Sequence, residues 1–96
     1  MSQDKTFTQQ CTICNKKGLH ARASRKLAIL AQQFDATLDI KNDGQTAPAT
    51  SIMDLLMLGA GPGSKVSIIA KGPQAREGLE AITELIALGF EEDTDG

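Results

Sequence analysis

Residues 7–34 read FTQQCTICNKKGLHARASRKLAILAQQF, and the fold follows from this stretch because its hydrophobic period changes partway along. In residues 7–14, Phe, Gln, Cys and Ile alternate with Thr, Gln, Thr and Cys, which predicts a half-buried strand. Residues 15–19 then turn the chain. After His20, apolar side chains recur every three or four residues, which predicts a helix over residues 21–33.

The next elements are predicted by alternation and by turn signals. Residues 37–41 and 45–50 are expected to form a hairpin, because the Asn-Asp-Gly sequence at residues 42–44 favours a tight turn. Pro48 cannot donate a hydrogen bond to a neighbouring strand. The second strand of this hairpin is therefore expected at an edge of the sheet.

The last part of the chain adds two helices and a strand. Ser51 is expected to cap a short helix, and residues 65–71 alternate as a strand. A final helix is expected to have Pro73 in its first position and to end at Gly89 in a left-handed cap. The order β-α-β-β-α-β-α predicts an α+β open-faced sandwich, with a four-stranded antiparallel sheet and three helices on one face.

Length and composition indicate one compact domain that spans residues 1–96, ordered from about residue 6 to residue 90. The acidic residues Glu91, Glu92 and Asp93 oppose the dipole of the last helix, so the tail is expected to fray. The chain starts with polar residues, and no apolar run approaches the roughly 20 residues of a membrane span. The sequence therefore predicts a cytoplasmic protein.

Cys11 and Cys14 have the spacing of a redox or zinc-binding pair. In a strand, this spacing separates the two Cα atoms by about 10 Å and points the side chains to opposite faces. A disulfide tolerates only about 7 Å. The chain has no second cysteine pair, and its single histidine lies elsewhere. We therefore expect ordinary strand cysteines and no metal site.

The net charge of −2 is distributed unevenly along the chain. Residues 5–34 hold six of the ten Lys and Arg residues and none of the twelve Asp and Glu residues. Such a basic zone on an acidic protein indicates a face that docks a partner or handles an anion, and a solvated helix face is the alternative. Aromatic residues make up 3% of the chain, without Trp or Tyr, which disfavours nucleic acid as a partner.

His20 is the candidate reactive residue. A side chain at a helix N-terminus faces unpaired backbone N–H groups and the positive end of the helix dipole. This field disfavours the imidazolium and leaves a neutral ring nitrogen to attack phosphorus, after which the N–H groups can bind the phosphoryl oxygens. Arg22 could pair with those oxygens, and Lys16, Lys17 and Arg25 add a weaker positive field. From spacing alone, a plain helix cap or a surface histidine remains the alternative.

Residues 18–22 read GLHAR, and residues 51–53 (SIM) are followed by Leu58 and Gly59. These segments resemble the two motifs of the histidine-containing phosphocarrier family, HPr, of the bacterial phosphoenolpyruvate-dependent phosphotransferase system. The likeness covers nearly the whole chain and includes the order of elements. It implies phosphorylation of His20 on Nδ1, with Arg22 stabilising the phosphoryl group.

The resemblance also implies partners. Enzyme I of the system would donate the phosphoryl group and an IIA-type protein would accept it, with no metal or organic cofactor on this chain. The protein would be a monomeric carrier rather than a free-standing enzyme. Ser51 would be the regulatory serine that a kinase phosphorylates in some family members. The surface that meets enzyme I would comprise Ala21, Arg25, Ile52, Met53 and Leu56, and burial in the core is the alternative for the apolar ones.

One residue departs from the family pattern, since Ala23 stands where the family usually has Pro, and this affects the expected transfer rate and the ordering of Arg22. Residues 41–43, 72–74 and 87–93 are similar to NPr, the nitrogen-related branch, and sugar uptake and nitrogen-related regulation both remain open. Two other classes of function are a small-ligand-binding regulatory domain and a protein-binding regulator that is never phosphorylated. The intact His-Ala-Arg sequence favours the carrier over both.

Overall fold

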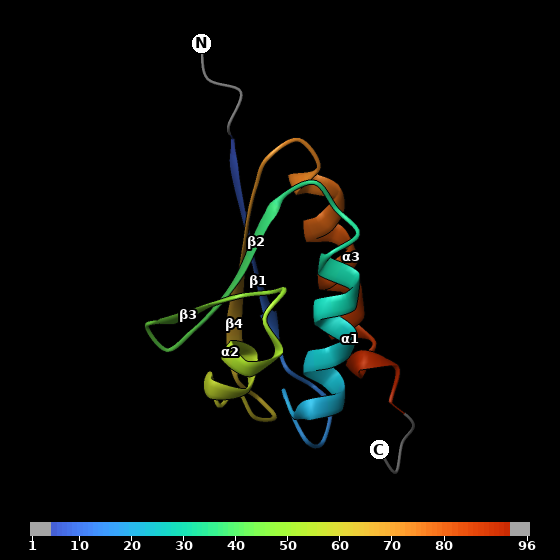
Figure 1. Cartoon of the computed structure of the whole chain (residues 1–96). Helices are drawn as coiled ribbons and strands as arrows, with labels where there is room; N and C mark the ends of the chain where they lie inside the picture. The colour runs from blue at the N-terminus through green and yellow to red at the C-terminus, as the bar shows by residue number, and fades with distance from the viewer. Residues whose placement is uncertain (1–4, 93–96) are drawn as a thin grey trace.

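The computed structural model describes residues 5–92 (Figure 1). Its elements follow the predicted order and end in a short 3-10 turn, η1. They are β1 (Thr6–Thr12), α1 (Ala21–Ala31), β2 (Thr37–Asn42), β3 (Gln45–Pro48), α2 (Ile52–Met57), β4 (Lys65–Lys71), α3 (Ala75–Ala87) and η1 (Gly89–Glu91). Within the described residues, each helix is too short or too polar to cross a membrane.

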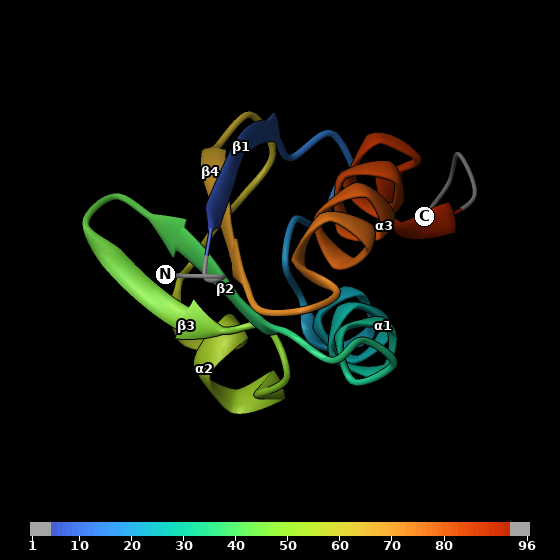
Figure 2. The same cartoon turned by 90° about the horizontal axis from the view of Figure 1, so that it is seen from above.

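The four strands form one antiparallel sheet in the order β1-β4-β2-β3. Strand β4 is central, with Val66 opposite Cys11 of β1 and Ile68 opposite Ile40 of β2. Alternate residues of β4 are fully buried beneath the helices, which cover one face of the sheet (Figure 2). The predicted α+β open-faced sandwich is confirmed.

The hairpin forms as its turn residues predict. Asp43 and Gly44 have φ angles of 54° and 84°. Positive values at both central residues are typical of the type I′ turn that joins twisted strands. Strand β3 lies at the edge of the sheet and ends at Pro48, as the missing N–H of proline requires.

The core lies between the sheet and the helices. Helix α1 buries Leu27 and α3 buries Ile82, each fully. Gly78 in α3 allows this helix to lie close to β2, since a Cβ atom there would stand 2.9 Å from Cδ1 of Leu38. Phe90, beyond α3, is also fully buried. The core therefore links α3 and its C-terminal extension to α1 and to the sheet.

The start of α3 differs from the prediction, because the helix begins at Ala75 and Pro73 lies before it. The backbone N–H of Gln74 donates to the carbonyl of Asp35 at 2.9 Å, and the backbone N–H of Asp35 donates to Oε1 of Gln74 at 2.7 Å. This reciprocal pair fixes Gln74 at the N-cap, with a non-helical φ of −110° and ψ of 30°. A tertiary contact thus displaces the helix start that proline favours.

The prediction that both cysteines lie on the first strand is wrong for Cys14. Strand β1 ends at Thr12, and Cys14 lies beyond it, exposed, with its Sγ directed at the carbonyl of Ile86 at 3.4 Å. Both cysteines are free. Burial raises the pKa of the Cys11 thiol. Helix α1 also ends two residues earlier than predicted, at Ala31.

Beyond α3 the backbone passes through a run of left-handed residues. Gly89 has a φ of 63°, as its predicted cap role requires, and Phe90 and Glu91 continue with φ angles of 58° and 59°. Glu91 closes η1 and Glu92 follows it, and the predicted fraying of the acidic tail stays a prediction. Residue 93 and the rest of the predicted frayed tail lie outside the described residues.

Candidate functional site

His20 occupies the N-cap of α1, as predicted, with an extended backbone (φ −80°, ψ −175°). Its carbonyl accepts from the N–H of Ser24 at 2.8 Å, the first hydrogen bond of the helix. The preceding loop is held against the loop that follows α2, because the N–H of Leu19 donates to the carbonyl of Ala60 at 2.9 Å. Gly18 permits this approach with a φ of 64°. These backbone contacts therefore fix the position of the His20 main chain, from which the imidazole projects.

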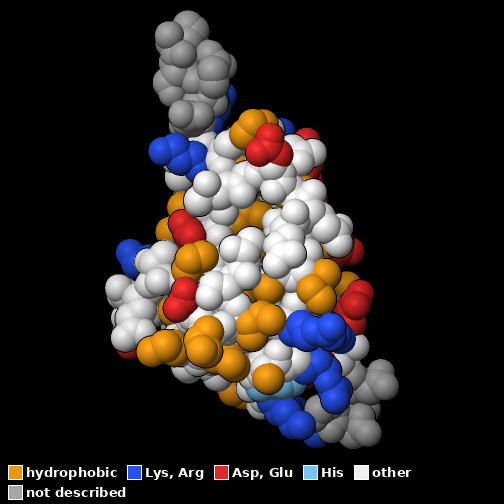
Figure 3. All heavy atoms as spheres, in the orientation of Figure 1, with side chains coloured by type: hydrophobic (Ala, Val, Ile, Leu, Met, Phe, Trp, Pro, Cys, Tyr) orange, Lys and Arg blue, Asp and Glu red, His pale blue; other side chains and the backbone are white. Residues whose placement is uncertain are grey.

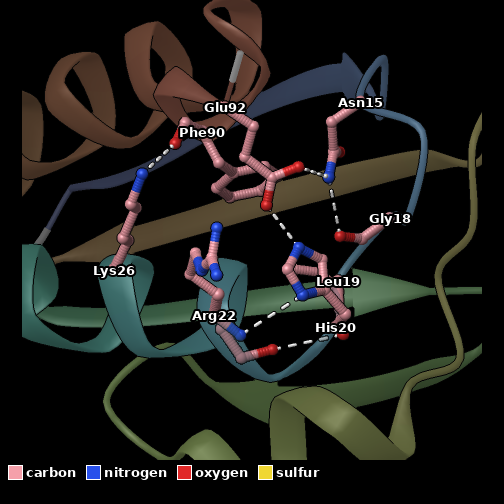
Figure 4. Close-up of polar contacts among 9 residues, drawn as sticks. Asn15, Gly18, Leu19, His20, Arg22, Lys26, Phe90 and Glu92 are labelled. Atoms are coloured by element: carbon pink, nitrogen blue, oxygen red, sulfur yellow. Dashed lines mark hydrogen bonds and ion pairs between the residues drawn. The ribbon is translucent and has the colours of Figure 1, made fainter. Parts of the chain in front are cut away.

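The two ring nitrogens of His20 have different partners (Figure 4). Nδ1 accepts from the backbone N–H of Arg22 at 3.3 Å, while Nε2 contacts a carboxylate oxygen of Glu92. A backbone N–H can only donate and a carboxylate can only accept. These partners place the proton on Nε2 and leave a lone pair on Nδ1. The side chain of His20 is 24% exposed.

Glu92 is held in place by a second partner. Its other carboxylate oxygen accepts from Nδ2 of Asn15 at 3.0 Å, and the same Nδ2 donates to the carbonyl of Gly18 at 2.9 Å. The Glu92 side chain is only 4% exposed. Its burial raises the pKa, but hydrogen bonds from Asn15 and His20 and the positive charge of Lys26 outweigh burial. The pKa of Glu92 therefore lies below its usual value, and the carboxylate is ionised at neutral pH.

Three basic residues of α1 lie along the same end of the molecule. The guanidinium of Arg22 extends on the same side of α1 as the His20 ring (Figure 4), and Arg25 is also exposed. Nζ of Lys26 donates to the carbonyl of Phe90 at 2.7 Å, which ties α1 to the turn that carries Glu92. Neither this tie nor the place of Glu92 in the site is predicted by the sequence, where the only local signal is the acidic run at residues 91–93.

The predicted apolar patch on α2 is at the surface. Leu55 is fully buried, whereas four neighbouring side chains are exposed. They are Ile52 (39%), Met53 (71%), Leu56 (41%) and Met57 (74%), and we call these four the α2 patch. The alternative of core burial is therefore wrong for the three residues predicted to meet a partner, and Met57 joins them.

The histidine lies between two surfaces of different chemistry. Figure 3 shows hydrophobic side chains gathered over α2, Lys and Arg side chains gathered at the N-terminal end of α1, and the histidine between them. Helices α1 and α2 pack against each other. Ser51 caps α2, since its Oγ accepts from the N–H of Asp54 at 3.2 Å. Within residues 5–92, no group of three or more His, Cys, Asp or Glu side chains is placed to hold a metal ion.

Comparison with known proteins identifies the family of this chain. Residues 7–87 match the family described as "PTS HPr component phosphorylation site". The chain belongs to the HPr family. Phosphocarrier protein NPr of Shewanella violacea is 48% identical over 84 residues, which cover 88% of this chain and 92% of that protein. Phosphocarrier protein HPr of Cupriavidus necator is 46% identical over 81 residues, which cover 84% of this chain and 91% of that protein.

Solved structures of the HPr family share the fold. The crystal structure of HPr-C-His from Thermoanaerobacter tengcongensis superposes with a TM-score of 0.87 at 31% identity, covering 91% of this chain and 98% of that one. The HPr match includes His20, Arg22 and Ser51 but stops at residue 87. Glu92 lies beyond the residues that this match covers. The relatives named NPr and HPr are almost equally similar, so identity alone does not separate the two branches.

Proposed function

We propose that this HPr-family protein accepts a phosphoryl group on Nδ1 of His20 from phospho-enzyme I and passes it to an IIA-type acceptor. In this proposal it works as a monomer in the cytoplasm. The observation that carries the proposal is the ring geometry: Nδ1 presents a lone pair at the N-terminus of α1, while Nε2 is engaged by Glu92. A nucleophile and an anion-binding helix end thus coincide.

The chemistry follows from this geometry. The Nδ1 lone pair attacks phosphorus, the bond to the donor breaks, and its electron pair stays with the donor. The backbone N–H of Arg22, now directed at Nδ1, is then close enough to bind a phosphoryl oxygen. The exposed guanidinium of Arg22 would supply a charge-assisted hydrogen bond to the same group.

A direct test follows the phosphoryl group along the proposed relay. The protein is incubated with enzyme I and labelled phosphoenolpyruvate, then with an IIA-type acceptor from sugar uptake or from the nitrogen-related chain. Label should appear on the carrier and then leave it for an acceptor. Comparison of the two acceptors assigns the branch, and label that never leaves the carrier would contradict the carrier role.

We expect Arg22→Ala to keep the fold and to slow phosphorylation by enzyme I roughly tenfold. A charge-assisted hydrogen bond is worth about 1.5–3 kcal/mol, and an exposed one lies at the low end of that range. The measurement is the initial rate of label uptake from phospho-enzyme I. Lys71→Ala is the matched control, since it removes an exposed positive charge at the far end of β4. Equal rates for the two variants would remove Arg22 from the site.

The docking face in this proposal combines α2 and the start of α1. The exposed α2 patch supplies apolar area, and Ala21 and Arg25 are exposed beside it on α1. Exposed apolar side chains of this kind are typical of protein-protein contacts. Enzyme I and the acceptor would both need to reach His20, so they would use this face in turn.

Ser51 provides a way to regulate that docking. We expect Ser51→Asp to slow phosphorylation of His20 roughly tenfold, because a charge beside Ile52 and Met53 must be desolvated against an apolar partner. Asp also caps helices well, so the melting temperature should change little. Rates and melting temperatures of wild type, Ser51→Ala and Ser51→Asp are compared. A wild-type rate for the Asp variant would leave Ser51 as a helix cap only.

A further inference from the structure

The carboxylate of Glu92 touches the reactive histidine although 72 positions separate the two residues. Each of its oxygens has a partner, His20 on one side and Asn15 on the other, and the side chain is 4% exposed. Asn15 is itself buried and is bound to the carbonyl of Gly18. The carboxylate therefore belongs to a packed cluster behind the ring, away from the Nδ1 lone pair.

The backbone that carries Glu92 is built to bring it there. Residues 89–91 all have left-handed φ angles, between 58° and 63°, and two of them are not glycine. For residues other than glycine such a backbone is strained and persists only where surrounding contacts fix it. Here the contacts are the fully buried Phe90 side chain and the 2.7 Å hydrogen bond from Lys26 to its carbonyl. Both anchor the turn immediately before Glu92.

We propose that Glu92 is a positioning residue for His20, an inference that rests on the proposed function. By accepting from Nε2–H, the carboxylate keeps the proton on that nitrogen and orients the ring with its Nδ1 lone pair at the start of α1. When this lone pair forms the N–P bond, the donor keeps the electron pair of the bond that breaks. The ring retains its Nε2 proton and becomes positively charged, and the adjacent carboxylate stabilises that charge.

The same contact assists the second transfer. When the acceptor attacks phosphorus, the electron pair of the N–P bond returns to Nδ1. A ring that has kept its Nε2 proton leaves as neutral imidazole, whereas a ring that has lost it would leave as an imidazolate, a much poorer leaving group. Glu92 therefore assists both the phosphorylation of His20 and the transfer to the acceptor, and it does so through the ring without touching the phosphoryl group.

The test compares wild type with Glu92→Gln, which keeps the size of the side chain and removes its charge. Glu91→Gln is the matched control, because Glu91 is the exposed neighbour and the change in charge is the same. Ring resonances of His20 are recorded by ¹H–¹⁵N NMR on the unphosphorylated proteins. Rates of phosphorylation are then measured against concentration, with phospho-enzyme I as the donor.

In wild type and Glu91→Gln, we expect a Nε2–H proton far downfield, as in charge-assisted hydrogen bonds. In Glu92→Gln this signal should move upfield or exchange away, and kcat should fall roughly tenfold with the half-saturating concentration unchanged. Unchanged ring signals, or equal kcat for the two variants, would overturn the inference alone. Absence of label on wild type would overturn the proposed function, and the role of Glu92 with it.

Discussion

Replacing His20 with alanine should abolish the acid-labile phosphate completely while the protein still folds. His20 is the only histidine in the chain, so no second imidazole can take its place. The side chain is 24% exposed at a helix N-cap and is not part of the hydrophobic core, so its removal costs the cap and the contact with Glu92. Loss of a capping acceptor costs about 1 kcal/mol, a small part of the stability of a domain. Label uptake from enzyme I and phosphoenolpyruvate is measured beside the circular dichroism spectrum.

His20→Asn is the matched control for this prediction. Asparagine is among the best N-cap residues, so it keeps an acceptor for the N–H of Arg22 but offers no ring nitrogen. Both variants should be unlabelled, and the asparagine variant should melt closer to wild type. Acid-labile label on either variant would show that the phosphoryl group is carried elsewhere.

Gly18→Ala should destabilise the protein by about 3 kcal/mol, which lowers the melting temperature of a domain of this size by about 15 °C. Gly18 has a φ of 64°, which costs an L-residue about 1 kcal/mol or more. In addition, a Cβ atom there would stand 2.7 Å from Cα of Gly61 and would also overlap the carbonyl of Ala60. Both atoms belong to backbone, so a loop must shift. Thermal unfolding measures the change.

Gly59→Ala separates the two causes, because Gly59 has the same φ of 64° and no atom lies within 4 Å of a Cβ atom there. This variant should lose only about 1 kcal/mol. The Gly18 variant should also transfer phosphoryl groups more slowly at temperatures where it is folded, since its loop sets the position of His20. Equal melting temperatures for the two variants would show that the contact between the loops is not tight.

Much of the fold could be predicted because local patterns and tertiary packing favour the same structure. The alternation in β4 and the three-to-four-residue period in α1 match the faces that these elements bury. The change of period beside His20 placed that residue at a helix end, and the structure confirms it as the N-cap. The turn residues Asp43 and Gly44 likewise predicted the hairpin, and both have the positive φ angles that its tight turn requires.

The errors arise where a distant contact overrides a local preference. Pro73 favours the first position of a helix, but the reciprocal hydrogen bonds between Gln74 and Asp35 move the start of α3 to Ala75. No sequence pattern near Pro73 predicts a contact with Asp35. The exposure of the α2 patch was left open rather than wrong, because α2 is apolar on nearly every side and sequence periodicity cannot decide which side its neighbours cover.

The contact between Glu92 and His20 could not be predicted for the same reason. A negative charge after the last helix interacts unfavourably with the helix dipole, so the sequence predicts that such a residue belongs to a frayed tail. Its position depends on a run of left-handed residues, of which only Gly89 has a sequence signal, and on the burial of Phe90. The histidine and its helix were therefore predictable, whereas the group behind the ring required the structure.

The most direct measurement for the proposed carrier role is NMR of the wild-type protein after phosphorylation by enzyme I and phosphoenolpyruvate. We expect one phosphate per chain, labile in acid and stable in alkali, with ³¹P–¹⁵N coupling to Nδ1 of His20. A phosphate on Nε2 would contradict the ring orientation that Glu92 and Arg22 define. An acid-stable phosphate alone, or no phosphate at all, would contradict the proposed carrier function.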